Sequence, residues 1–204
     1  MATANVSHPT ITIDLILDRL TTKDVLRGVL HAILFHRLFG TVKPQTFEVL
    51  DVTMPGVSDS GMEQLVNEKV DAFWRGIEGG TNKRGQITVT FSEKRPKKSW
   101  FQVYMGEEDV PWEQWVINAE LRQPKSDRGV SVADDARNDS SQAVADRQAF
   151  NATLASTLTQ SIHTMLTHTS SEKGRSAVPL ITNASGISPF PIDIVVKIGG
   201  VEVG

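Results

Sequence analysis

Two adjacent aromatic residues behind a run of cations are the feature of this sequence best suited to binding chemistry. Trp100 and Phe101 follow a basic run and precede an acidic run at 107–109. Exposed aromatic side chains mark binding surfaces, because a partner gains much apolar contact by covering them. The same two rings would also fill a gap beneath their own loop, which would stabilise the fold by roughly 3–6 kcal/mol. The residues alone leave both interpretations open.

The basic run consists of Lys94, Arg95, Lys97 and Lys98. Such a run can meet phosphate, an anionic membrane or an acidic protein surface, or it can be a solvated loop that keeps its tip in solution. A further alternative is that these cations pair with the acidic residues at 107–109 on the returning arm. The net charge of the chain is −3, so the molecule as a whole has no field that would favour nucleic acid.

The histidines and the other titratable residues do not have the spacing that catalysis or metal binding requires. His31 and His36 are five residues apart in a predicted helix, about 140° apart around its axis, and His163 and His168 repeat that spacing. The chain has no cysteine, which excludes disulfides, thiolate metal sites and cysteine nucleophiles. It also lacks a phosphate-binding glycine loop, a nucleophile elbow and a zinc-protease motif. We therefore expect a non-enzymatic protein without a cofactor or a metal.

Composition places the chain among ordinary globular proteins. The apolar fraction of 39% in 204 residues is enough for one core, so we expect a single domain over residues 1–204. The first residues lack the basic flank and apolar run of a secretory signal, and no stretch approaches the roughly 20 apolar residues of a membrane span. These features predict a soluble, cytoplasmic protein.

The elements that must position the aromatic tip are a mixture of strands and helices. Strands are predicted at 11–17, 46–52, 87–91, 115–121 and 190–198, and helices at 22–39, 60–78 and 141–167. Thr21 and Ser60 are the predicted N-caps, and Pro55-Gly56 is expected to end the second strand. A polar stretch at about 123–141 is predicted to be flexible, and 170–188 is predicted to be a loop.

This order predicts an α+β domain in which an antiparallel or mixed sheet is covered on one face by three helices. Apolar residues surround the first helix, which is therefore the expected centre of the core. One face of the strand at 115–121 is expected to point toward the helices, and it carries Trp115, Ile117, Ala119 and Leu121. The residues between the two central strands, 92–110, form a long protruding loop in this prediction.

Two stretches of the sequence resemble the autophagy-related protein 101 family of HORMA-domain proteins. The first is the predicted helix at 25–37. The second, at 87–121, includes a Lys-Lys-Ser-Trp-Phe tip and the segment Val110-Pro111-Trp112-Glu113-x-Trp115. The resemblance is convincing over about residues 11–122, and the second half of the chain is similar only in pattern.

The resemblance implies a HORMA domain that pairs with the HORMA domain of autophagy-related protein 13 and stabilises it. The pair would serve in the complex around the autophagy-initiating kinase, at the phagophore assembly site. Trp100 and Phe101 would form an exposed finger that recruits downstream autophagy factors, although members of the family can have a residue between the two rings. By analogy with other HORMA dimers, the exposed side of the third helix is the expected pairing surface, and membrane contact would be indirect. The alternative from a different class is a peripheral membrane-binding module that uses the same basic and aromatic loop.

Overall fold

The computed structural model describes residues 8–97, 106–122, 136–182 and 186–204, and it describes the side chains of the long third helix from residue 141 onward. Three of the predicted binding residues, Lys98, Trp100 and Phe101, lie outside the described residues. So does the part of the predicted flexible connection at 123–135.

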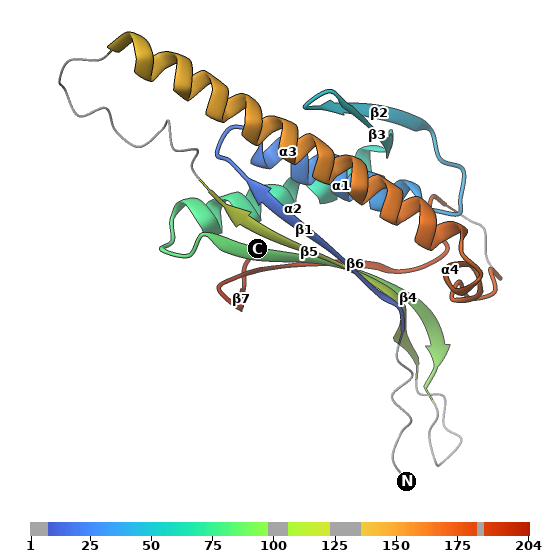
Figure 1. Cartoon of the computed structure of the whole chain (residues 1–204). Helices are drawn as coiled ribbons and strands as arrows, with labels where there is room; N and C mark the ends of the chain where they lie inside the picture. The colour runs from blue at the N-terminus through green and yellow to red at the C-terminus, as the bar shows by residue number, and fades with distance from the viewer. Residues whose placement is uncertain (1–7, 98–105, 123–135, 183–185) are drawn as a thin grey trace.

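A mixed five-stranded sheet forms the base of the molecule, with strand order β1-β5-β4-β6-β7 (Figure 1). The strands are β1 (Thr10–Leu17), β4 (Arg84–Pro96), β5 (Glu107–Leu121), β6 (Ile192–Ile198) and β7 (Val201–Glu202). β1 runs parallel to β5, whereas the β5–β4, β4–β6 and β6–β7 pairs are antiparallel. The predicted α+β class and the antiparallel pairing of the two central strands are therefore confirmed.

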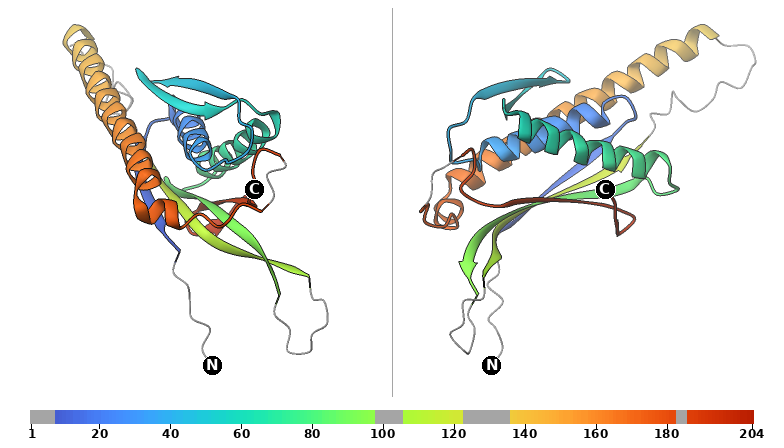
Figure 2. Two further views of the ribbon diagram at one scale, coloured as in Figure 1. Left: turned by 90° about the vertical axis from the view of Figure 1, so that its right-hand side faces the viewer. Right: turned by 180° about the vertical axis from the view of Figure 1, so that it is seen from behind.

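Helices α1 (Thr22–Phe35) and α2 (Ser60–Glu78) cover one face of this sheet, and a hairpin of β2 (Pro44–Val49) and β3 (Val52–Val57) lies over α1 on the side away from the sheet (Figure 2). The long helix α3 (Ala136–Ser170) runs diagonally past β1 at the edge of the sheet and is followed by the short helix α4 (Glu172–Ser176). An ion pair between Arg147 and Asp18 (3.1 Å) joins α3 to the turn between β1 and α1.

Helix α1 is the centre of the core, as its sequence predicts. It is enclosed by α2, α3 and the β2–β3 hairpin, so residues on every side of it are buried, from Val25 to Leu34. The predicted inward face of β5 is buried at Trp115, Ile117 and Ala119. Strand β4 contributes Ile87, Val89 and Phe91 to the same core.

Several predicted boundaries are wrong for local reasons. Helix α1 ends at Phe35 rather than near residue 39. Its N-cap is Thr21, as predicted, but the Thr21 side chain makes no cap bond, and its hydroxyl and backbone N–H both donate to the Asp18 carboxylate at 2.7 Å. The predicted strand at 46–52 is instead a hairpin, in which Leu50 and Asp51 make the turn with φ of 50° and 62°.

The predicted strand end at Pro55-Gly56 and the predicted N-cap of the second helix are also wrong. Pro55 and Gly56 lie inside β3 instead of ending a strand. The N-cap of α2 is Asp59, which accepts from the Met62 N–H at 2.9 Å, rather than Ser60. Helix α3 spans 136–170 instead of 141–167, and the predicted loop at 170–188 contains α4.

Candidate interaction site

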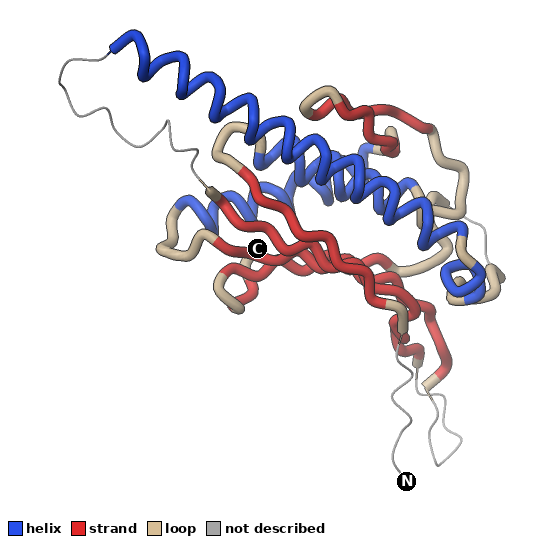
Figure 3. The backbone as a smooth tube through the Cα atoms, viewed as in Figure 1, coloured by secondary structure: helices blue, strands red, loops and turns tan. Residues whose placement is uncertain are grey.

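A two-stranded ribbon projects from one end of the sheet (Figure 3). Pairing of β5 with β1 begins at Gln114, and pairing of β4 with β6 ends at Phe91, so residues 92–96 and 107–112 form a ribbon beyond the sheet. The Lys97 N–H still donates to the Gly106 carbonyl at 3.1 Å. The prediction of a loop over 92–110 is therefore wrong at 92–96 and 107–110, which belong to β4 and β5, and residues 97–106 connect the strands.

The ribbon has one basic arm and one acidic arm. Lys94 and Arg95 lie opposite Asp109 and Glu108 in the ladder, and Lys97 is exposed just past the end of β4. Lys94 forms an ion pair with Glu107 across the ribbon (3.7 Å). At this residue the basic run therefore pairs with the acidic run, which was one of the alternatives that the sequence allowed. Exposed pairs of this kind contribute about 0–1 kcal/mol each. These charges therefore add little rigidity to the ribbon, and their larger effect is to oppose pairing of its open strand edges with another chain.

A β-bulge marks the base of the ribbon. The register shifts between Phe91, which pairs with Glu113, and Ser92, which pairs with Pro111, so Trp112 is the extra residue. A bulge redirects the neighbouring side chains, and here Trp112 and Glu113 are both buried although they are adjacent. The Trp112 ring packs 5.6 Å from the Phe91 ring and 5.3 Å from the Phe190 ring.

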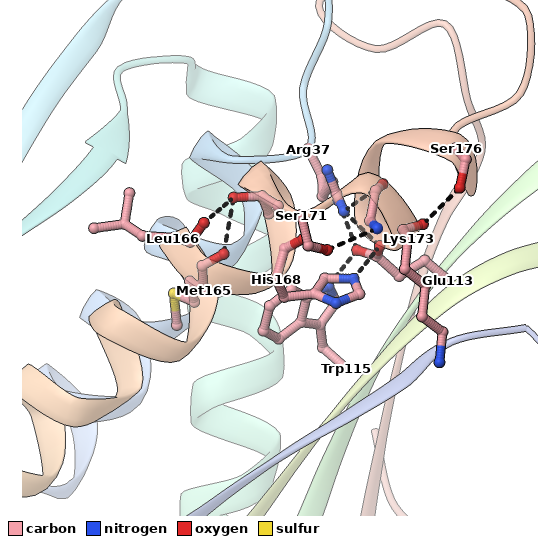
Figure 4. A network of polar contacts seen from close by, with 11 residues as sticks. Arg37, Glu113, Trp115, Met165, Leu166, His168, Ser171, Lys173 and Ser176 are labelled. Carbon is pink, nitrogen blue, oxygen red and sulfur yellow. Dashed lines mark hydrogen bonds and ion pairs between the residues drawn. The ribbon is translucent and has the colours of Figure 1, made fainter.

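Glu113 is the centre of a buried polar network that sequence analysis missed (Figure 4). Its carboxylate accepts from Arg37 Nε (2.7 Å), Arg37 Nη2 (2.6 Å) and the Trp115 indole N–H (2.6 Å), and His168 Nε2 lies 2.8 Å away. The Glu113 side chain is 0% exposed and that of Arg37 is 3% exposed. Such bidentate pairing in a dry site is strong and directional.

The network joins four elements at one corner of the molecule. Arg37 follows α1, Glu113 and Trp115 belong to β5, and His168 lies in the last turn of α3. Arg37 Nη2 also donates to the Gly174 carbonyl of α4 at 3.2 Å. The sequence held an indirect signal for Glu113, because extending the inward face of the predicted strand at 115–121 by two residues before its start reaches this position.

Burial distinguishes His31 and His36 from His163. Burial lowers the pKa of His31, whose ring lies 4.6 Å from the Phe47 ring and whose Nδ1 has no hydrogen-bond partner within the described part of the chain. Burial, with a smaller contribution from Arg37, also lowers the pKa of His36, the C-cap residue of α1. His163 is exposed on α3.

A groove of about 1050 Å³ lies between α3 and the polar face of the sheet. Gln86 and Asn118 on its floor are hydrogen-bonded to each other at 2.9 Å. Its charged lining contains equal numbers of acidic and basic side chains, namely Asp14, Glu120 and Asp146 against Arg84, Arg122 and Lys197. The groove therefore does not select a charged ligand, and the ribbon is the more informative candidate site.

Comparison with known proteins gives a consistent result. The sequence pattern of the family described as autophagy-related protein 101 matches residues 14–185, which include both arms of the ribbon and the Glu113 network. The autophagy-related protein 101 of Schizosaccharomyces pombe is 34% identical over 113 residues, covering 55% of this chain and 59% of that protein. That of Arabidopsis thaliana is 36% identical over 105 residues, covering 50% and 47%.

The matched segments span about half the length of these two relatives. Within the part of the chain that the structure describes, no helix combines the length and the apolar character needed to cross a bilayer. The family match covers far more than half of the chain, and it includes part of β1, the strands β2 to β5 and all four helices of the described residues, whereas β6 and β7 lie beyond it. The chain belongs to the autophagy-related protein 101 family.

Proposed function

We propose that this chain is a non-enzymatic adaptor in autophagy initiation, built as a single HORMA domain. It pairs with the HORMA domain of autophagy-related protein 13 and stabilises it within the complex around the autophagy-initiating kinase. Through Trp100 and Phe101 it recruits downstream autophagy factors at the phagophore assembly site. Membership of the family supports this proposal, and so does a sheet covered by helices.

The projecting ribbon is the observation that carries the proposal. The two ends of the connection that contains Trp100 and Phe101 are Lys97 and Gly106, and both are exposed beyond the sheet. The ribbon residues next to them are charged, so burying them against the core would cost desolvation free energy. A stalk of this kind favours the presentation of its tip to a partner over packing against the domain.

The exposed side of α3 is the proposed surface for pairing with the second HORMA domain. Most of its described side chains are small or polar, and Val144 and Leu166 are exposed apolar residues on it. His168 and Arg147 fix the same helix to the body of the domain. A fixed helix with an unpaired outer side is a suitable platform for a partner, because little conformational entropy is lost on binding.

The test of the finger is a double substitution, Trp100→Ala with Phe101→Ala. Because the proposal places both rings in solvent, we expect an unchanged Tm and unchanged pairing with autophagy-related protein 13, but loss of downstream factors from a pull-down. A matched control, Leu20→Ala with Leu180→Ala, removes two apolar side chains that are 72% and 85% exposed elsewhere. We expect this control to leave recruitment intact.

The contrary outcome is a large loss of stability. If the two rings were buried beneath their own loop, their removal would cost roughly 3–6 kcal/mol. In a domain of this size that corresponds to a fall in Tm of about 6–24 °C. Such a fall would assign Trp100 and Phe101 to the core and refute the finger.

A membrane-binding module is the second candidate, favoured by the exposed cations Lys94, Arg95 and Lys97 near the end of the ribbon. The acidic arm at 107–109 opposes it, because it places equal negative charge beside them. The test is flotation with liposomes that contain anionic lipid, comparing the parent with a variant in which Lys94, Arg95, Lys97 and Lys98 are changed to Glu. Salt-sensitive flotation of the parent that the variant loses would support this candidate, and no flotation of the parent would exclude it.

A further inference from the structure

The ribbon leaves the sheet at Glu113. This residue pairs with Phe91, the last residue of β4 that is also paired with β6. Beyond this point the two arms of the ribbon are paired only with each other, apart from the hydrogen bond from the Ser92 N–H to the Pro191 carbonyl. Any contact that fixes Glu113 therefore fixes the base on which the ribbon turns.

The contacts of Glu113 come from parts of the chain that are distant in sequence. Arg37 lies 76 residues before it and His168 lies 55 residues after it. Arg37 also lies over the Trp112 ring, with its guanidinium carbon 5.7 Å from the ring centroid. One arginine therefore contacts both residues of the bulge, the acid through hydrogen bonds and the indole through its face.

Stability alone is a weak explanation for this network. Buried ion pairs can often be replaced by apolar side chains of similar volume without loss of stability, because desolvating two charges is costly. What an ion pair adds over apolar contact is direction, since its hydrogen bonds tolerate only a narrow range of angles and distances. The α3–α4 corner is closely fitted in the same region, where Gly174 lies too near the His168 carbonyl to admit a Cβ atom.

We propose that Glu113 is a positioning residue, which holds the β4–β5 ribbon at a fixed angle to the α3–α4 corner through Arg37 and His168. The proposal rests on the adaptor function above in so far as the ribbon presents Trp100 and Phe101 to a partner. Figure 1 shows the ribbon and the α3–α4 corner at the same end of the molecule. A partner that contacts the tip would then meet it in one orientation instead of many.

The test measures the distance between the ribbon and α4 directly. The natural chain has no cysteine, so Lys97→Cys with Glu172→Cys introduces two unique sites for spin labels at exposed positions. Electron paramagnetic resonance on the full-length chain then gives the distribution of label distances. In the parent we expect one narrow peak.

The informative variant is His168→Phe. It keeps a ring edge-on to Trp115, as in the native contact of 5.6 Å and 85°, but removes the bond to Glu113. Glu113 stays paired with Arg37, so the variant is expected to fold. We expect its single narrow peak to be lost, and we expect His168→Gln, whose amide nitrogen can reach the position of Nε2, to restore it. The matched control is His163→Phe, which replaces an exposed histidine about 1.4 turns earlier on α3, and its distribution should equal that of the parent.

Glu113→Gln provides a second, stronger perturbation in the same labelled chain. A distribution that stays narrow in folded His168→Phe overturns the positioning role, whatever the result for Glu113→Gln. A distribution that broadens, with recovery in His168→Gln, supports it.

Pull-downs of downstream factors separate this result from the proposed function. If the peak broadens but the Trp100→Ala/Phe101→Ala variant recruits as well as the parent, then the finger fails and the positioning role of Glu113 stands.

Discussion

Removal of Arg37 should destabilise the domain far more than removal of any exposed arginine. In Arg37→Met the side-chain volume is nearly kept, but Glu113 remains as a carboxylate that is 0% exposed and has lost its cation. Breaking a buried pair from one side costs about 3–5 kcal/mol. That is a large share of the ~5–15 kcal/mol by which a domain of ordinary size is stable.

The assay is thermal unfolding followed by far-UV circular dichroism. For a chain of this length the loss corresponds to a fall in Tm of about 6–20 °C. The control is Arg19→Met, which removes an arginine whose side chain is 50% exposed and paired with a Glu78 that is 49% exposed. Exposed pairs contribute about 0–1 kcal/mol, so the Tm of the control should change by only a few degrees.

A double variant tests whether the unpaired charge is the cause. Arg37→Met with Glu113→Gln removes both charges, while the new amide oxygen can still accept from the Trp115 indole N–H. We expect a loss of about 1–3 kcal/mol, from imperfectly paired buried polar groups, and therefore a higher Tm than that of Arg37→Met alone. If the double variant unfolded at a lower temperature than Arg37→Met, or if Arg37→Met matched Arg19→Met, the account of a buried, charge-dependent network would be refuted.

Further predictions concern the packing of the corner, one turn and one buried histidine. Gly174→Ala should lower stability by about 1–3 kcal/mol in a thermal melt, because the added methyl group would meet the His168 carbonyl, and an unchanged Tm would contradict the close fit of α4 on α3. Asp51→Gly should raise stability by about 0.5–1 kcal/mol in urea unfolding, since the residue has φ of 62° in a two-residue hairpin turn, and a loss of stability would argue against that strain. Burial lowers the pKa of His31 below its ordinary 6.5, so the folded state binds fewer protons than the unfolded state and stability falls as the pH drops through that value. In His31→Gln the urea midpoint should therefore change less between about pH 7.5 and pH 5 than it does in the parent, and an equal slope in both proteins would refute the assignment.

The parts of the fold that were predictable are those whose signals are local. The apolar ring around α1 and the period-two face of β5 both follow from burial, and both are found where the sequence places them. The end of α1 was misplaced because Leu38 and Phe39 continue the apolar pattern beyond Phe35, where the helix ends. The bond from Arg37 to Glu113, a partner 76 residues away, is of a kind that periodicity cannot reveal. The turn at Leu50 was missed because leucine is not a turn-forming residue, although its φ is 50°.

The ribbon was predicted as a loop for a different reason. Strands are recognised from alternating apolar and polar residues, and this signal exists only where one face is buried. Beyond Ser92 and Trp112 the described ribbon residues are exposed or half-buried, and charged side chains stand on both faces, as at Lys94 and Arg95. The network at its base was missed because no motif describes it, even though the inward position of Glu113 follows from that of Trp115.

The bulge and the buried acid are best understood together. Without the extra residue, Trp112 and Glu113 would point to opposite sides of β5, and only one of them could reach the interior. With it, the adjacent residues Trp112 and Glu113 provide an aromatic anchor against Phe190 and a charged anchor on Arg37. In the described part of the ribbon beyond this point, the ion pairs of Lys94 and Arg95 are exposed, and such pairs contribute about 0–1 kcal/mol each, which is too little to fix the direction of the ribbon. On the proposal above, its stiffness relative to the domain comes from the base, where the contacts are buried, directional and supplied by Arg37 just after α1 and by α3 and α4.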